Sequence, residues 1–146
     1  MFGLNLSKPW QGAGDPEADK RIYCDCSGTF INRDGVLNEP LFDFLKAAKE
    51  RGYDVVLVSS HPNLMQEMIE DALTQRGLAG DYFGAVQLKQ NHVGHSCVFV
   101  FDDVEREQRG FKAQYALFPD DPRIARMTQQ LEAGHSPSVV LRHNAA

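Results

Sequence analysis

Short apolar runs alternate along this chain with longer segments that carry apolar residues at helical spacing. The runs have the length of strands and are apolar at consecutive positions, as in strands buried on both faces of a sheet. The predicted strands span residues 22–25, 53–58, 85–88, 97–101 and 114–118. The predicted helices span residues 41–51 and roughly 122–132, with a third that begins at Pro62 and ends before Gly77. This order predicts an α/β fold, a Rossmann-like open parallel sheet with helices on both faces.

The length of 146 residues favours a single domain. Residues 1–20 are rich in Gly, Pro and Asp and have no periodicity, so we expect an irregular N-terminal arm there. The α/β domain is expected over residues 21–133, followed by a flexible tail over residues 134–146. Within the domain, Asp34-Gly35 is a strong turn signal and predicts a β-hairpin, called the flap below, over residues 29–37.

Composition argues against several kinds of protein. Lys and Arg total 15 against 20 acidic residues, and the formal charge of −5 disfavours general nucleic-acid binding. No apolar run approaches the ~20 residues that cross a bilayer, and residues 1–20 lack the apolar core of a signal peptide, so we expect no membrane association. The three cysteines include Cys24 and Cys26, which are poorly placed to pair with each other, and this favours a reduced, cytoplasmic protein.

Polar side chains follow the predicted strands where each strand ends. Asp25 follows the first strand, Ser59 the second, Lys89 the third, and Asp102-Asp103 the fourth. The carboxyl ends of parallel strands form the ligand-binding edge of an open sheet. A carboxylate that attacks phosphorus, further acids that bind Mg²⁺, and a hydroxyl and an ammonium that hold phosphoryl oxygens are what phosphoryl transfer needs.

These motifs resemble those of the haloacid-dehalogenase-like (HAD) superfamily of phosphotransferases. The matching segments are Asp25-Cys26-Ser27-Gly28-Thr29, Ser59 in Val-Leu-Val-Ser-Ser-His-Pro, Lys89, and Asp102-Asp103 in Val-Phe-Val-Phe-Asp-Asp, and they extend over residues 21–120. The resemblance implies a HAD-like fold in which Asp25 is the nucleophile and forms an aspartyl-phosphate.

The resemblance also assigns the remaining site residues. Mg²⁺ would be bound by Asp25, the backbone carbonyl of Ser27, Asp102 and Asp103. Ser59 and Lys89 would hold the phosphoryl group. Gly28, Thr29, Ser60 and His61 would lie beside the substrate.

Ser27 is a departure from the family pattern. Phosphatases of the family usually have a second Asp at this position as the general acid and base, and a hydroxyl has no pKa suited to that role. Three outcomes are open: hydrolysis restricted to good leaving groups, proton transfer by His61, or a domain that binds phosphate or a partner without turnover. Transport ATPases of the same superfamily have Thr at this position, so a hydroxyl is compatible with phosphoryl transfer.

Size predicts an open site. Only a hairpin and one helix fit between Asp25 and Ser59, and only a helix and a short strand fit between Ser59 and Lys89. The chain therefore resembles the capless members of the family. An open site suits a macromolecular phosphorylated substrate, or a second subunit, such as another copy of the chain, that excludes water.

Other interpretations of the same residues exist. The segment 32–38, Asn-Arg-Asp-Gly-Val-Leu-Asn, resembles the first motif of certain sugar-phosphate and histidinol-phosphate phosphatases, but Asn32 would replace the nucleophile, so we favour the flap. Lys112 is an alternative to Lys89. Ser59 or Ser60 could be a helix cap before Pro62, and Asp102-Asp103 could cap the helix that follows them. The receiver domain of response regulators has similar parts, but its acidic pair follows the first strand rather than the fourth.

Overall fold

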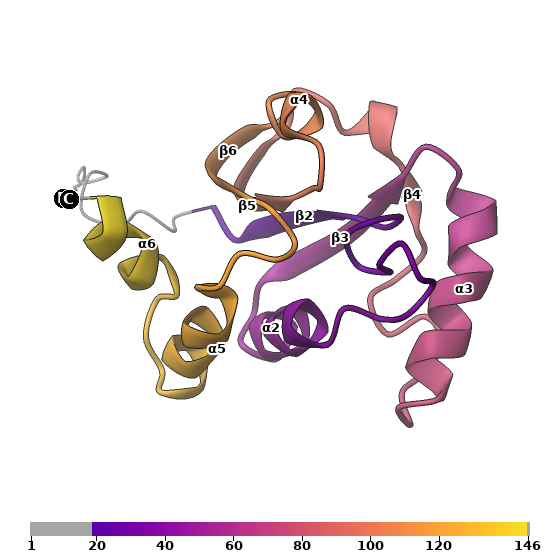
Figure 1. The fold of residues 1–146 in the computed structure, drawn as a ribbon, viewed down its shortest axis with the longest axis horizontal. Coiled ribbons are helices and arrows are strands. Elements are labelled where there is room, and N and C mark those ends of the chain that lie inside the picture. The colour runs from indigo at the N-terminus through magenta and orange to yellow at the C-terminus, as the bar shows by residue number, and fades with distance from the viewer. Residues whose placement is uncertain (1–18, 146) are drawn as a thin grey trace, which may run out of the picture.

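The computed structural model describes residues 19–145, with side chains described as far as Arg142. It contains one open sheet of five parallel strands in the order β4-β3-β2-β5-β6 (Figure 1). The strands are β2 (Arg21–Asp25), β3 (Asp54–Ser59), β4 (Gln87–Leu88), β5 (Ser96–Phe101) and β6 (Lys112–Leu117). The helices are α2 (Glu39–Glu50), α3 (Pro62–Thr74), α4 (Glu105–Gln108), α5 (Ile124–Glu132) and α6 (Ser138–Ala145), with a 3₁₀ turn η1 (Lys89–Asn91). The predicted α/β class and open parallel sheet are confirmed.

Strand order places the first strand of the domain at the centre of the sheet. β2 pairs with β3 on one side and with β5 on the other, so Cys24 lies opposite Leu57 and Phe101. If the five strands are numbered 1 to 5 along the chain, their order across the sheet is 3-2-1-4-5, which is the Rossmann order. Receiver-like folds have the order 2-1-3-4-5. From β2 the chain adds β3 and β4 on one side of the sheet and then returns to add β5 and β6 on the other side. This topological switch point is where open α/β sheets bind ligands.

The two faces of the sheet are covered unequally. Ile22, Phe99 and Phe101 belong to a large buried cluster with residues of α2, α3, α5 and α6, and the ring of Phe44 meets that of Phe99 edge-on at 5.8 Å. The opposite face has a smaller cluster that includes Tyr23. In Figure 1, α2 and α5 lie on one side of the sheet and the short α4 on the other. Helices thus flank both faces, as predicted, but the long ones lie on one face only.

Local sequence explains where α2 begins. The helix starts at Glu39 rather than at residue 41, because the side chain of Asn38 accepts a hydrogen bond from the backbone N–H of Leu41 and caps the first turn. Pro40 fits the first turn, where its missing N–H has no partner to lose. The same Asn38 side chain donates to the carbonyl oxygens of Thr29 at 3.2 Å and Pro119 at 3.0 Å. It therefore joins α2, the flap and the segment after β6.

We predict that Asn38→Ala lowers the free energy of unfolding by about 1–3 kcal/mol. The substitution removes a helix cap, worth about 1 kcal/mol, and leaves two carbonyl oxygens without their donor. The check is the midpoint of urea unfolding. Asn63→Ala, at an exposed position in the first turn of α3, is the matched control and should change the stability little. Equal midpoints for the two variants would contradict the joining role of Asn38.

The end of the chain differs from the prediction. A flexible tail was expected over residues 134–146, but Ser138–Ala145 form α6, which packs on α5. Val140 and Leu141 are buried in the large cluster. Only a few apolar residues hold this helix, too few to give a clear period in the sequence. The arm predicted over residues 1–20 lies outside the described residues, apart from Asp19 and Lys20.

None of the helices formed by residues 19–145 is both long and apolar enough to span a lipid bilayer.

Candidate functional site

Three carboxylates meet at the switch point. Asp25 is the last residue of β2, and Asp102 and Asp103 directly follow β5. Each offers an oxygen atom within 4.8 Å of the others, and we call these three residues the acid cluster. Asp25 and Asp102 are buried, Asp102 with only 1 % of its surface exposed, while Asp103 is half-buried. The prediction that residues 25, 102 and 103 lie together is confirmed.

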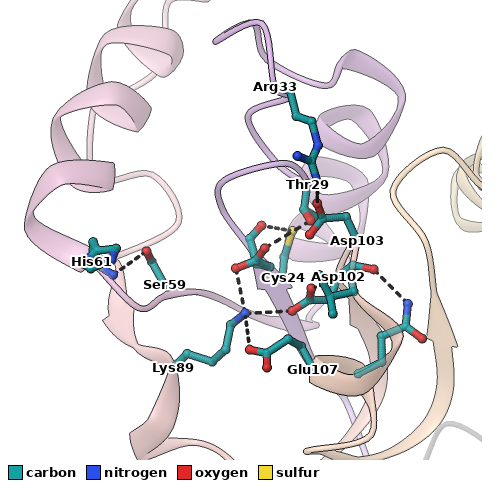
Figure 2. A network of polar contacts seen from close by, with 12 residues as sticks. Cys24, Thr29, Arg33, Ser59, His61, Lys89, Asp102, Asp103 and Glu107 are labelled. Atoms are coloured by element: carbon teal, nitrogen blue, oxygen red, sulfur yellow. Dashed lines mark hydrogen bonds and ion pairs between the residues drawn. The ribbon is translucent and has the colours of Figure 1, made fainter.

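Lys89 lies against the acid cluster. Its Nζ is 3.0 Å from Oδ1 of Asp25, 2.9 Å from Oδ2 of Asp102 and 3.3 Å from Oε1 of Glu107 (Figure 2). The residue is buried at the start of η1, directly after β4, so its side chain reaches the switch point from beyond β3. The ammonium therefore neutralises part of the charge that the strand ends bring together.

Lys112, the alternative lysine, lies at the other edge of the sheet. It is exposed and begins β6, where it pairs with Ser96, the first residue of β5. Both residues are at the amino ends of their strands, and in a parallel sheet these ends lie opposite to the carboxyl ends, where the acid cluster is. Lys89 is therefore the lysine of this site.

The buried carboxylates are electrostatically unfavourable when all are charged. Burial raises the pKa of Asp25 to about 6, and the charge of Asp102 adds to the rise, while Lys89 opposes it. Burial also raises the pKa of Asp102, against the hydrogen bond from Lys89. Burial lowers the pKa of the Lys89 ammonium, but its contacts with Asp102 and Asp25 outweigh this and raise the pKa overall.

The charges and ligand atoms of the site suit a divalent cation. Four carboxylates, those of the acid cluster and Glu107, face two cations, Lys89 and Arg33. A surplus of negative charge therefore remains at the acid cluster. Mg²⁺ prefers oxygen ligands and binds proteins through one or a few carboxylates. The acid cluster offers such ligands within a small radius, so it is a possible metal-binding site.

The loop after β2 is shaped by glycine and threonine. Gly28 has a φ of +79°, and a Cβ atom there would overlap the carboxylate of Asp103. The buried Thr29 hydroxyl donates to Oδ2 of Asp25 at 3.3 Å and helps to fix that side chain. Ser27 is exposed, and its backbone bridges to Ile31. Gly28 and Thr29 are therefore needed for the geometry of the acid cluster.

The segment 32–38 forms the turn and second side of the flap. The side-chain oxygen of Asn32 accepts hydrogen bonds from the backbone N–H groups of Asp34 and Val36, and Ile31 bridges to Leu37. Asn32 is thus a turn residue, as the flap interpretation predicts. Sheet pairing between the two sides of the flap is limited to this one bridge between residues 31 and 37.

The flap also contributes a charge. The guanidinium of Arg33, 83 % exposed, is 3.0 Å from Oδ2 of Asp103 (Figure 2). The tip of the flap is thereby tied to the acid cluster by an ion pair.

Ser59 and its neighbours lie beside the acid cluster rather than in it. Ser59 is buried at the end of β3, and its hydroxyl accepts a hydrogen bond from the backbone N–H of His61 at 2.9 Å. Figure 2 shows Ser59 and His61 apart from Lys89, Asp102 and Asp103. Ser60 and His61 are exposed. Within residues 19–142, no hydrogen bond or ion pair links these three side chains to the acid cluster. Their roles toward a phosphoryl group stay predictions.

Two charged residues of the site were not predicted. Glu107 contacts Lys89 across 18 residues of sequence, and Arg33 contacts Asp103 across 70. The only sequence signal for Glu107 is its place shortly after Asp102-Asp103, because the burial of Lys89 and its need for counter-charges become visible only in the structure. Asp102 has a second role at the same place, because its Oδ1 accepts from the N–H of Val104 ahead of α4.

Comparison of the chain with protein-family models, with curated proteins and with solved structures finds no match in any of the three.

Proposed function

We propose that this chain is a Mg²⁺-dependent phosphoryl-transfer hydrolase of HAD-like type, in which Asp25 forms an aspartyl-phosphate. The observation that supports it best is the meeting of Asp25, Asp102 and Asp103 at the switch point with Lys89 in direct contact. Acids that only end a strand or cap a helix are usually exposed and need no counter-ion, whereas Asp25 and Asp102 are buried against an ammonium, an arrangement typical of a functional site. The three free, buried cysteines fit our proposal of a reducing, cytoplasmic setting.

The proposed metal ligands are Asp25, Asp102, Asp103 and the carbonyl oxygen of Ser27. When bound, Mg²⁺ would neutralise the charge of the phosphoryl oxygens and of the nucleophile. Lys89 would supply a second positive charge at the same place, and its contact with Asp25 would direct the carboxylate toward phosphorus. Thr29 would hold the other oxygen of Asp25.

The reaction would proceed in two displacements at phosphorus. A carboxylate oxygen of Asp25 attacks, the bond from phosphorus to the leaving oxygen breaks, and that oxygen departs with the electron pair and takes a proton from water or solvent. A water molecule then attacks the phosphorus of the acyl phosphate and loses a proton. The bond to Asp25 breaks, which regenerates the carboxylate and releases inorganic phosphate.

A second candidate function is a HAD-like domain that binds phosphate or a partner without turnover. The observation that favours it is Ser27, since the structure gives this exposed hydroxyl no hydrogen-bond partner in residues 19–142 that could make it an acid. The two functions differ in whether Asp25 ever becomes phosphorylated.

The test of the proposed function is phosphate release from acetyl phosphate and p-nitrophenyl phosphate with and without Mg²⁺. Release that requires Mg²⁺ supports the enzyme. A crystal structure with Mg²⁺ and beryllium fluoride should show beryllium bonded to a carboxylate oxygen of Asp25, as a mimic of the aspartyl-phosphate. No release from either substrate, together with no adduct, would favour the domain without turnover.

We predict that Ser27→Asp raises the hydrolysis of alkyl phosphates by about 10²-fold or more. An acid at residue 27 could protonate the leaving oxygen and activate water, while acetyl phosphate, with its good leaving group, should gain much less. The measurement is kcat/KM for both substrates. The control is Ser27→Asn, whose side chain is similar in size to Asp but is not an acid, so it should give no such gain. Equal rates in the Asp and Asn variants would mean that a missing acid at residue 27 does not limit turnover.

A further inference from the structure

A groove of about 920 Å³ opens beside the acid cluster. Its walls are the flap, the first turn of α2 and the segment between β6 and α5. Gly28, Thr29, Arg33 and Asp103 line both this groove and the site, so the two are continuous. A phosphoryl group held over Asp25 would have this groove as a neighbouring space for the rest of its molecule. We call it the flap groove.

The walls of the flap groove are held by internal contacts. Asn38 donates one hydrogen bond to the flap side at Thr29 and one to the far wall at Pro119. On the far wall, Asp121 accepts from the backbone and the guanidinium of Arg123 at 2.7–3.0 Å. The groove therefore exists before anything binds, which reduces the ordering cost of binding.

The lining combines apolar surface with unpaired negative charge. Ile124 and Leu37 are buried beneath it, and Phe118 is a large apolar side chain left 44 % exposed. Arg33 is the only cation among the residues that line the groove, and it is already paired with Asp103. Asp34 and Asp120 are exposed, and their carboxylates have no ion-pair or hydrogen-bond partner in residues 19–142. The surface thus matches a ligand with apolar and positively charged groups.

We propose that the flap groove binds the polypeptide part of a phosphoprotein substrate, a segment with basic and apolar side chains next to the phosphorylated residue. This inference rests on the proposed function and specifies its substrate class. Asp34 and Asp120 would face the basic side chains, and Phe118 would contact the apolar ones. A nucleotide or nucleic acid would bring further phosphates against these acids, which disfavours it.

Among residues 19–142 no inserted domain covers the groove, and this favours a polypeptide over a small metabolite. Sites for small molecules enclose most of the ligand surface. Between Asp25 and Lys89 the chain adds only the flap, α2 and α3 around the sheet, and none of these closes over the groove. A phosphoprotein would cover the open side with its own surface and so exclude water from the reaction.

The experiment compares two synthetic phosphopeptides that share the phosphorylated residue and a neighbouring Leu but are flanked by Lys and Arg or by Glu. We expect kcat/KM to be roughly 10-fold higher for the basic peptide at low salt, with a smaller ratio at high salt. Asp120→Lys and Asp34→Lys should each lower the ratio, and the double variant should remove or invert it. Asp81→Lys adds the same charge at an exposed acid that does not line the groove and should leave the ratio unchanged.

The outcomes separate this inference from the proposed function. The leaving group of acetyl phosphate is acetate, which is too small to fill the groove, so hydrolysis of this substrate tests the reaction at Asp25 and not the groove. If acetyl phosphate is hydrolysed but the two peptides react equally, or if a nucleoside monophosphate reacts faster than both, the inference on the flap groove is wrong. If neither acetyl phosphate nor p-nitrophenyl phosphate is hydrolysed and no beryllium fluoride adduct forms, the proposed function fails. In that case the two phosphopeptides are labelled with a fluorophore and their dissociation constants are measured by fluorescence anisotropy. Equal dissociation constants for the basic and the acidic peptide would overturn the inference on the flap groove.

Discussion

Asp25→Asn is expected to lower Mg²⁺-dependent phosphate release by at least about 10⁴-fold, because an amide cannot form the aspartyl-phosphate. The same variant should keep the fold and become more stable when no metal is present. The side chain keeps its size, and Lys89 retains its contacts with Asp102 and Glu107. The variant thus separates the cost of the charge at residue 25 from its use in the proposed reaction.

The stability change should depend on pH in a defined direction. The pKa of Asp25 is raised to about 6 in the folded protein, above about 3.9 in an unfolded chain. Its protonation therefore contributes stability that is fully present below about pH 4 and is lost as the pH rises through 6. At pH 7 the ionised Asp25 should cost about 1–3 kcal/mol, which the Asn variant avoids.

The measurement is urea unfolding of both proteins in the presence of a chelator at pH 7 and pH 4.5. The advantage of the variant should be largest at pH 7 and should shrink toward pH 4.5. Asp81→Asn, at an exposed position, is the control for both activity and stability. Phosphate release that survives Asp25→Asn would mean that the nucleophile is wrongly assigned. A variant less stable than the wild type at pH 7 would contradict the electrostatic interpretation.

Lys89→Met should have the largest effect on stability. The substitution leaves Asp25 and Asp102 buried and close together without their ammonium, and removing one partner of a buried ion pair is strongly destabilising. We expect a loss of about 2–4 kcal/mol at pH 7 in the absence of metal. Lys112→Met removes an exposed lysine at the opposite edge and should change the stability by less than about 0.5 kcal/mol.

Mg²⁺ should restore much of the stability that Lys89→Met loses. The ion would bind two carboxylates that the ammonium already contacts and would be repelled by its charge, so the variant should bind Mg²⁺ about 10-fold or more tightly than the wild type. It should nevertheless release phosphate more slowly, because the positive charge beside the phosphoryl group is lost. The check is the unfolding midpoint as a function of Mg²⁺ concentration, with Ca²⁺ for comparison. Equal stabilisation of both proteins by Mg²⁺ would contradict a metal site at these carboxylates.

The acid cluster could be predicted because each of its residues directly follows a strong apolar run. Asp25 ends β2 and Asp102 directly follows β5, both strands are buried on both faces, and parallel pairing brings the two acids to the same end of the sheet. The further fact needed to make the two acids neighbours is that β2 and β5 lie side by side, and the structure shows this. Lys89 could not be chosen over Lys112 from sequence, since the preceding strand, Gln87–Leu88, has two residues and almost no pattern.

The contacts that the sequence did not predict depend on distances in space rather than on local pattern. Arg33 was identified as a turn residue of the flap, and only the folded structure places it against Asp103. Glu107 faces Lys89 because α4 returns over the thinly covered side of the sheet. α6 was missed because its stability comes from packing on α5 and not from its own periodicity.

Lys89 gives the chain a counter-ion of its own at the place where the carboxylates crowd together. Folding and the proposed binding of a cation can therefore be separate events. A newly synthesised chain does not have to wait for an ion before its central strands come together, and a chelator should remove the proposed Mg²⁺ without unfolding the protein.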